Sequence, residues 1–149
     1  MKIKDLLTNV LQNAELMVAN EPFTFSGKAT IELEGGEARY WLFSSNGGMI
    51  SVSPDDEELT YFRLLEDEIE PENETVGYAG KDFEFSYEDV GSVTSVEGDA
   101  QIESDERYAF SDYEADDGET IRLVHNENSG NKLVFIGSLV GEDDVVMVE

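Results

Sequence analysis

ARYWLFSSNGGMISVSPDDEELTYFRLL, residues 38–65, decides how this chain folds. Together with Glu37 just before it, the stretch forms three short runs rich in aromatic and β-branched residues, at 37–44, 49–53 and 59–65, a composition typical of strands. Asn46-Gly47 separates the first two runs and suits a tight hairpin turn. The stretch therefore predicts three consecutive β-strands.

The strand pattern continues from Pro22 to the end of the chain. Gly, Asn and Asp clusters again mark the breaks, and Gly35-Gly36, Asp117-Gly118 and Ser129-Gly130 are further turn signals. Most of the chain is therefore expected to be β. The other predicted strands lie at 23–26, 29–34, from 76 onward, and at 82–87, 91–97, 107–113, 120–125, 132–136 and 145–148.

The first residues follow a different period. Apolar residues recur at helical spacing, which predicts one amphipathic helix over residues 1–16. We expect its apolar stripe to pack on the sheet of its own domain rather than on a partner. The stripe consists of Ile3, Leu6, Leu7, Val10, Leu11 and Ala14.

The two halves of the chain resemble each other. Residues 22–33 align with 82–96, and residues 38–65 align with 106–140. A half of about 60 residues buries too little surface to be stable alone, so the halves are expected to share a core. The aligned residues include Arg39-Tyr40 with Arg107-Tyr108, Ile50 with Ile121, and Phe62 with Phe135.

These patterns predict a mainly β fold in a single domain, 1–149. Two diverged repeats are expected to form small twisted antiparallel sheets or partial barrels packed together, with one short N-terminal α-helix. The acidic, Pro-containing segment EDEIEPENE is expected to be a solvated connection. The predicted parts are the helix 1–16, the first β repeat 17–65, the connection 66–74 and the second β repeat 75–149.

The charge of the chain limits its partners. Against 35 Asp and Glu there are 9 Lys and Arg, a net charge of −26 at pH 7. Nucleic acid and anionic membranes are therefore disfavoured, because binding phosphates requires clustered basic residues. No apolar run approaches the roughly 20 residues of a membrane span, and no signal peptide is recognisable, so a cytoplasmic protein without membrane insertion is expected.

A family resemblance follows from the order of aromatic, Gly and turn positions. Tyr40-Trp41-Leu42 precedes a turn and the aliphatic Ile50-Ser51-Val52, and the second half has Phe83, Gly91-Ser92-Val93, Glu97-Gly98, 107–113 and Asp117-Gly118. Over residues 17–140 the chain resembles the prokaryotic family called domain of unknown function 4178. One departure is Asn20-Glu21-Pro22, where members usually have a Gly-Asp step. The resemblance implies an accessory role and no established reaction.

The chain offers few residues for catalysis. It has no Cys and one His, His125, which the strand pattern places near a turn as a structural residue rather than a general base. Two acidic clusters hold hard oxygen ligands, yet solvated turns are the expected reading of both. We assign no catalytic, cofactor-binding or metal-binding residue and expect no cofactor. The two clusters are Asp116, Asp117 and Glu119, and Glu142, Asp143 and Asp144.

Two further groups of residues have structural explanations. Arg39 and Arg107 are rare cations among many acids, so each is expected to form local ion pairs. An aromatic set could form a binding surface, although core and cross-strand packing is the expected role of such residues. The set is Tyr40, Trp41, Phe43, Phe110 and Tyr113.

The leading functional hypothesis is a non-enzymatic accessory module that binds a basic protein surface. One alternative is an acidic mimic of nucleic acid that inhibits a DNA-binding protein. Another is that the acidity is a halophilic adaptation that implies no partner. An enzyme is the least favoured class, and the sequence leaves the oligomeric state open.

Overall fold

A computed structural model describes residues 1–148, which contain eleven β-strands, one α-helix and two 3-10 turns. The helix is α1 (Ile3–Thr8), and the turns are η1 (Pro54–Asp56) and η2 (Glu142–Asp144). Each predicted strand overlaps an observed one, and each predicted turn lies between two strands. The strands are β1 (Glu15–Val18), β2 (Glu21–Leu33), β3 (Ala38–Ser44), β4 (Gly48–Ser53), β5 (Glu58–Leu65), β6 (Thr75–Tyr78), β7 (Lys81–Gly98), β8 (Arg107–Glu114), β9 (Thr120–Asn126), β10 (Lys132–Val140) and β11 (Val145–Met147).

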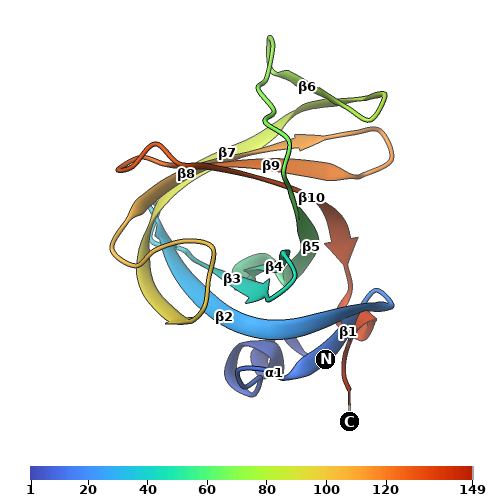
Figure 1. Ribbon diagram of the computed structural model, residues 1–149, viewed down its shortest axis with the longest axis vertical. Helices are drawn as coiled ribbons and strands as arrows, with labels where there is room; N and C mark the ends of the chain where they lie inside the picture. The colour runs from blue at the N-terminus through green and yellow to red at the C-terminus, as the bar shows by residue number, and fades with distance from the viewer. Residues whose placement is uncertain (149) are drawn as a thin grey trace.

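Eight strands close into one antiparallel barrel. β2–β5 form one up-and-down run and β7–β10 another; β5 pairs with β10, and β2 pairs with β7. Figure 1 shows the ring that they form. The prediction of separate sheets or partial barrels packed together is therefore wrong. Packed partial barrels would leave strand edges unpaired, whereas closure pairs the edge strands of both runs.

Two long strands bend to close the ring. β2 shifts register against β3 between Phe25 and Gly27, and β7 shifts against β8 between Phe85 and Tyr87 and against β2 at Thr94. Such bulges bend a strand and increase its twist. The sequence predicted two strands in place of each of these. In β2 the predicted break at 27–28 adjoins the register shift, whereas in β7 the predicted break at 88–90 lies between the two shifts.

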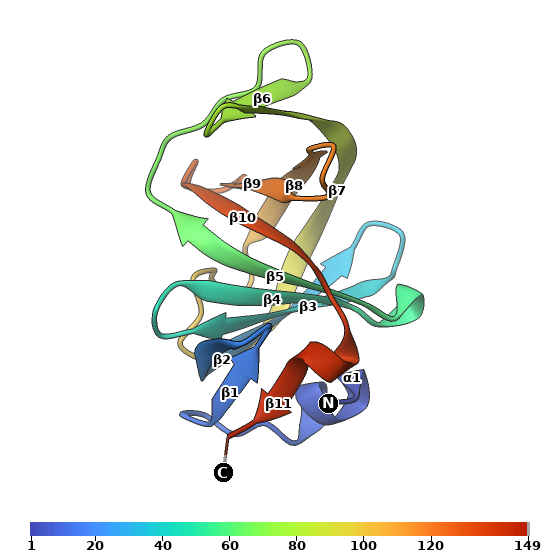
Figure 2. The same ribbon diagram turned by 90° about the vertical axis from the view of Figure 1, so that its right-hand side faces the viewer.

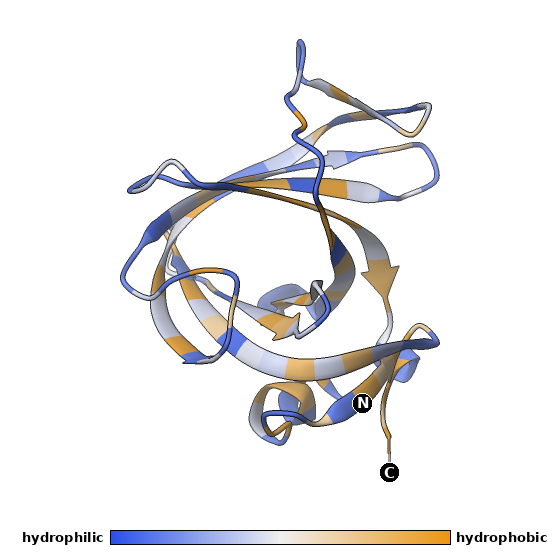
Figure 3. Ribbon diagram, viewed as in Figure 1, coloured by the Kyte–Doolittle hydropathy of each residue, from blue (hydrophilic) through white to orange (hydrophobic). Residues whose placement is uncertain are grey.

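Both halves of the chain contribute to the barrel interior. Edge-on aromatic contacts join β3 to β8 through Trp41 and Phe110, 5.5 Å apart, and β5 to β10 through Phe62 and Phe135, 6.3 Å apart. Figure 3 shows hydrophobic and hydrophilic residues alternating along the barrel strands. The expected shared core is therefore present. Its buried members are Ala29, Ile31, Leu33, Trp41, Phe43, Met49, Phe62, Val93, Ile102, Tyr108, Phe110, Val124 and Phe135.

Additional elements cover the outside of the barrel at two places. α1, β1 and β11 lie at one end, and the β6–β7 hairpin lies at the other, as Figure 2 shows. The first group buries an outer cluster that includes Leu6, Leu42 and Ile50, and the hairpin buries a second that includes Phe83 and Ile121. β3 and β4 are consequently buried on both faces.

The helix is shorter than the predicted 1–16. It ends at Thr8, and Asn13 has a left-handed φ of 72°. The Asn13 N–H donates to the carbonyl of Phe25 at 2.8 Å, so the chain here joins the sheet instead of continuing the helix. Leu6 is buried against the domain as expected, whereas Leu11 is 76% exposed. No helix within residues 1–148 is long and apolar enough to cross a membrane.

The structure tests the alignment of the two halves by the face that each side chain occupies. Ile50 and Ile121 both lie outside the barrel, and Phe62 and Phe135 both lie inside. Tyr40, however, packs on the outer cluster, whereas Tyr108 lies in the interior. Neighbouring residues of a strand face opposite sides of the sheet. The alignment of Arg39-Tyr40 with Arg107-Tyr108 is therefore wrong, because it is displaced by an odd number of residues.

The segment 66–74, predicted as a connection, contains no named strand, and all its residues except Ile69 are exposed. Ile69 packs against the second cluster, the one that includes Phe83 and Ile121 beneath the β6–β7 hairpin. The last residue of the predicted second repeat, 149, lies outside the described residues.

Candidate functional site

A buried ion pair lies inside the barrel, between neighbouring strands. The Nε of Arg122, on β9, donates to Oδ1 of Asp112, on β8, at 2.7 Å, and its Nη2 donates to Oδ2 at 2.8 Å. Its Nη1 reaches across the barrel and donates to Oγ of Ser51, on β4, at 2.7 Å. Only 9% of the Arg122 side chain and 14% of the Asp112 side chain are exposed. The forked geometry and low exposure make this the best-shielded ion pair in residues 1–148.

Three aromatic rings surround the same guanidinium. Its central carbon lies 4.9 Å from the ring centre of Phe62, 5.0 Å from Phe110 and 5.5 Å from Trp41. A cation over aromatic faces is stabilised, more so when water is excluded. The rings do not replace the hydrogen bonds between Arg122 and Asp112, so removing either ionic partner would leave a charge that is largely shielded from water.

A polar cavity of about 190 Å³ opens beside this pair at one end of the barrel. We call it the polar end cavity. Four of the six buried polar residues in the described chain line it: Ser51, Thr60, Thr120 and Arg122. Its exposed lining residues are Asp56, Glu58, Ser86, Tyr87, Glu114 and Leu139.

Tyr87 at this opening has a perturbed acidity. Its hydroxyl donates to Oδ2 of Asp89 at 2.6 Å. Partial burial of Tyr87, together with that hydrogen bond, raises its pKa to about 12, and the nearby Arg39 opposes the shift. Tyr87 is therefore a neutral hydrogen-bonding group at neutral pH.

A second hollow, of about 570 Å³, lies where β5 ends and β10 begins. We call it the acidic groove. Its apolar lining consists of Leu64, Leu65, Ile69, Leu133 and Val134, and its acidic lining consists of Glu66, Asp67, Glu68 and Glu70. Lys132 is the basic residue among its lining, and its Nζ lies 3.5 Å from Oε1 of Glu70 with both side chains largely exposed. The groove therefore combines apolar surface with several unneutralised carboxylates.

The structure does not bring together His125 and the two acidic clusters that the sequence offered for chemistry. His125 is exposed on the outer face of β9. In the first acidic cluster, Nζ of Lys81 lies 2.7 Å from Oδ2 of Asp117 and 2.6 Å from Oε1 of Glu119, and this contact lowers the pKa of Asp117. A lysine thus lies between these carboxylates. Among residues 1–148, no three acidic or imidazole side chains come together as a metal site would require.

The second acidic cluster contacts the backbone. Oε2 of Glu142 accepts a hydrogen bond from the N–H of Ile3 at 2.6 Å, and Oδ2 of Asp144 accepts one from the N–H of Gly141 at 2.8 Å. These contacts join η2 to the start of α1 and close the turn before β11.

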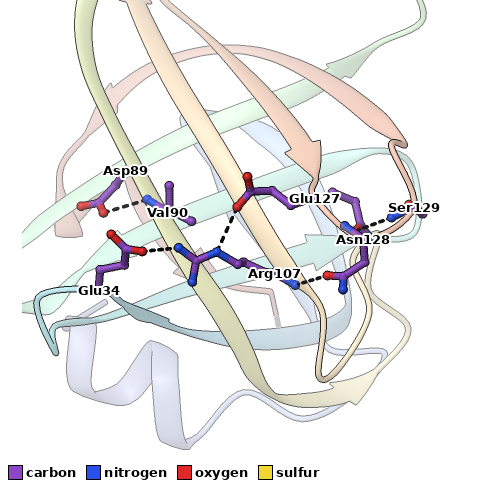
Figure 4. A network of polar contacts seen from close by, with 8 residues as sticks. Glu34, Asp89, Val90, Arg107, Glu127, Asn128 and Ser129 are labelled. Carbon is purple, nitrogen blue, oxygen red and sulfur yellow. Dashed lines mark hydrogen bonds and ion pairs between the residues drawn. The ribbon is translucent and has the colours of Figure 1, made fainter.

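The prediction that Arg39 and Arg107 form local ion pairs is confirmed. Figure 4 shows Arg107 between Glu34 and Glu127, with its Nε 3.0 Å from Oε1 of Glu127. Its backbone N–H also donates to Asn128. Nη1 of Arg39 lies 3.2 Å from Oε2 of Glu37.

The aromatic set is distributed between core clusters, as its expected packing role requires. Trp41, Phe43 and Phe110 lie in the barrel interior, Tyr113 lies beneath the β6–β7 hairpin, and Tyr40 packs on the outer cluster near α1. The alternative of one aromatic binding surface is therefore wrong.

Sequence reasoning missed the pair Arg122–Asp112. Strand alternation places Arg122 on the same face as Thr120 and Val124, and Asp112 on the same face as Phe110. That pattern was readable from the sequence. The pattern does not show that the strands close into a barrel, and only this closure places the face of Arg122 and Asp112 in an interior.

Comparison of the chain with known protein families, with curated proteins and with solved structures found no match.

Proposed function

We propose that this chain is a non-enzymatic accessory module that binds a basic segment of another protein in the acidic groove. The single observation that carries this role is the composition of the groove, which places the exposed Glu66, Asp67 and Glu68 beside partly buried apolar side chains. A partner segment with one aliphatic anchor flanked by Lys or Arg would complement both parts.

The apolar lining provides the anchoring surface. Leu64 and Leu133 pack against the barrel interior, and Leu65 and Ile69 pack against the cluster beneath the hairpin. These four side chains are partly rather than fully buried, so they can still contact a partner. Burying one aliphatic side chain of a partner contributes about 1.5–3 kcal/mol.

The charge of the chain favours a basic partner over others. Eight of the 35 Asp and Glu side chains form ion pairs within residues 1–148, and six of the nine basic residues are used in these pairs. The remaining carboxylates produce a negative field that accelerates encounter with cations. Salt at about 0.15 M screens this field beyond about 8 Å, so affinity should fall as salt rises.

The resemblance to domain of unknown function 4178 and the descent of the two halves from one repeat remain parts of this proposal. Corresponding hairpins, β1–β2 and β6–β7, precede the two strand runs and support a duplication. A halophilic adaptation instead predicts folding only at high salt, and a nucleic-acid mimic predicts competition with duplex DNA.

A peptide-binding experiment tests the proposed role. A fluorescent peptide with one Leu flanked by Lys and Arg is titrated with the protein, and anisotropy is recorded at low and moderate salt. The groove variant carries Glu66→Gln, Asp67→Asn and Glu68→Gln. The matched control removes three charges elsewhere, through Glu21→Gln, Asp55→Asn and Glu57→Gln; all six residues are exposed.

The expected result is saturable binding that the groove variant weakens about tenfold and the control weakens less than about twofold. An equal loss in both variants would mean that the overall field binds the peptide without the groove. Binding that is absent, or insensitive to salt, would contradict a basic partner.

A further inference from the structure

The polar end cavity differs from the rest of the barrel interior. Other interior side chains are mostly apolar, yet Ser51, Thr60, Thr120 and Arg122 are all at least 91% buried and line this one hollow. Burying polar groups costs free energy unless they are hydrogen-bonded. A ligand in the cavity would bond to the donors and acceptors that these side chains leave unused; among the described residues, the one fully buried side-chain atom without a partner is Nε1 of Trp41.

The buried part of the cavity has hydrogen-bond donors to spare. A guanidinium has five N–H groups, and Arg122 directs three of them to Asp112 and Ser51. The other two belong to its terminal nitrogens. The hydroxyl of Thr60 forms no hydrogen bond with the described residues, and the hydroxyl of Ser51 accepts from Arg122. This end of the cavity therefore suits an acceptor.

The opening of the cavity has the opposite character. Asp56, Glu58 and Glu114 form no ion pair with any Lys or Arg of residues 1–148. Asp56 accepts a hydrogen bond from Ser53 at 3.2 Å, and Glu114 accepts one from Ser86 at 3.2 Å. Ionised carboxylates only accept hydrogen bonds. Arg39 also lines the cavity and is paired with Glu37, so unpaired carboxylates outnumber cations there and the opening suits a positively charged donor.

The geometry points to a binding site for a small zwitterion, of the size and charge pattern of an α-amino acid, in the polar end cavity. Its carboxylate would accept from Arg122 and Thr60, and its ammonium group would donate to Glu58 and Glu114. The 190 Å³ equals the liquid volume of about six water molecules, room for a small amino acid.

The local charges disfavour the other ligand classes. A simple anion meets three unpaired carboxylates at the opening, whereas a simple cation leaves the spare donors of Arg122 unused. This site is separate from the acidic groove. Glu58 and Leu139 mark the cavity ends of β5 and β10, and Leu65 and Lys132 mark their groove ends.

Isothermal titration calorimetry with single amino acids tests this site. The twenty amino acids are screened at up to about 10 mM, and the tightest is compared with its methyl ester, which lacks the negative charge, and with the acid that lacks the amino group. Glucose serves as a neutral, hydroxyl-rich probe. The double variant Glu58→Gln and Glu114→Gln changes exposed residues, and Glu57→Gln is its neighbouring control outside the lining. Circular dichroism verifies that each variant folds.

We expect at least one amino acid to bind saturably, about tenfold tighter than either single-charge probe. The double variant should weaken it about tenfold, and Glu57→Gln by less than about twofold. The site is overturned if no amino acid binds saturably, if the ester binds as tightly as the amino acid, or if glucose alone binds.

Discussion

Replacing Asp112 by Ala should strongly destabilise the protein, because it breaks an ion pair that little solvent reaches. The substitution leaves the Arg122 guanidinium inside the barrel after two hydrogen bonds, of 2.7 and 2.8 Å, are lost. Its remaining bond is to a neutral hydroxyl, that of Ser51. The folded state must then accommodate an uncompensated cation.

The magnitude follows from how little solvent reaches the pair. With 9% and 14% of the two side chains exposed, screening is weak. Breaking a buried pair by removing one partner costs about 3–5 kcal/mol, whereas an exposed pair contributes about 0–1 kcal/mol. At about 2–4 °C per kcal/mol for a chain of this size, the Tm should fall by roughly 10 °C.

Urea unfolding provides the assay. Trp41 is the sole Trp, is fully buried and lies 5.5 Å from the Arg122 guanidinium, so its fluorescence reports on this region. Asp116→Ala, at an exposed position on the turn after β8, is the control. Adding Arg122→Met to Asp112→Ala should recover much of the loss. A cost below about 1 kcal/mol for Asp112→Ala would refute the reasoning, because it would place the pair among solvated ones.

Three further outcomes are expected. Folding raises the pKa of Tyr87 from 10.0 to about 12, so its contribution to stability is present below pH 10 and is lost as pH rises towards 12. In an ultraviolet titration of the tyrosines, Tyr87→Phe should remove the ionisation step near pH 12, and an unchanged curve would contradict this. A Cβ on Gly137 would overlap the carbonyl oxygen of Tyr61 on the neighbouring strand β5, so Gly137→Ala should cost at least about 2 kcal/mol in urea unfolding. Gly77→Ala, with open space around the added Cβ, should change stability by no more than about 0.5 kcal/mol; equal effects of the two substitutions would argue against the close approach of β5 and β10. Lys81→Gln should raise the pKa of Asp117 towards its ordinary value in a carboxyl NMR titration, and a pKa that stays low would show that another group causes the shift.

Local patterns predicted most of the strands but not how they close. Alternation and the Gly and Asn turns are properties of neighbouring residues, so β3, β4 and β5 were readable from residues 38–65. The pairing of β2 with β7 joins residues 58 (Leu33 and Gly91) to 71 (Gly27 and Gly98) positions apart, and its register shifts at Thr94. Local patterns of neighbouring residues do not show a pairing over such a distance. Helical periodicity also could not predict where the six-residue helix ends, because apolar residues continue at helical spacing past Asn9.

The site was less predictable than the fold for the same reason. Arg39 and Arg107 were rightly expected to pair with carboxylates, because a cation among many acids finds a partner wherever it lies. As a rare cation, Arg122 is not distinguished from Arg39 and Arg107 by the sequence. Only the closure of the barrel makes Arg122 a buried cation among aromatic rings. Likewise, the sequence predicts a solvated connection at residues 66–70, and only the folded chain places the start of β10 beside them to form the acidic groove.

The most direct test of the proposed role is to map the peptide contact by NMR. The Lys- and Arg-flanked Leu peptide is added to ¹⁵N-labelled protein, and amide shifts are followed along the chain. Binding in the acidic groove predicts that the largest shifts fall in residues 64–70 and 130–134, with η1 and the β1–β2 hairpin nearly unchanged. Shifts spread evenly over the acidic surface, or centred elsewhere, would contradict a basic partner bound in this groove.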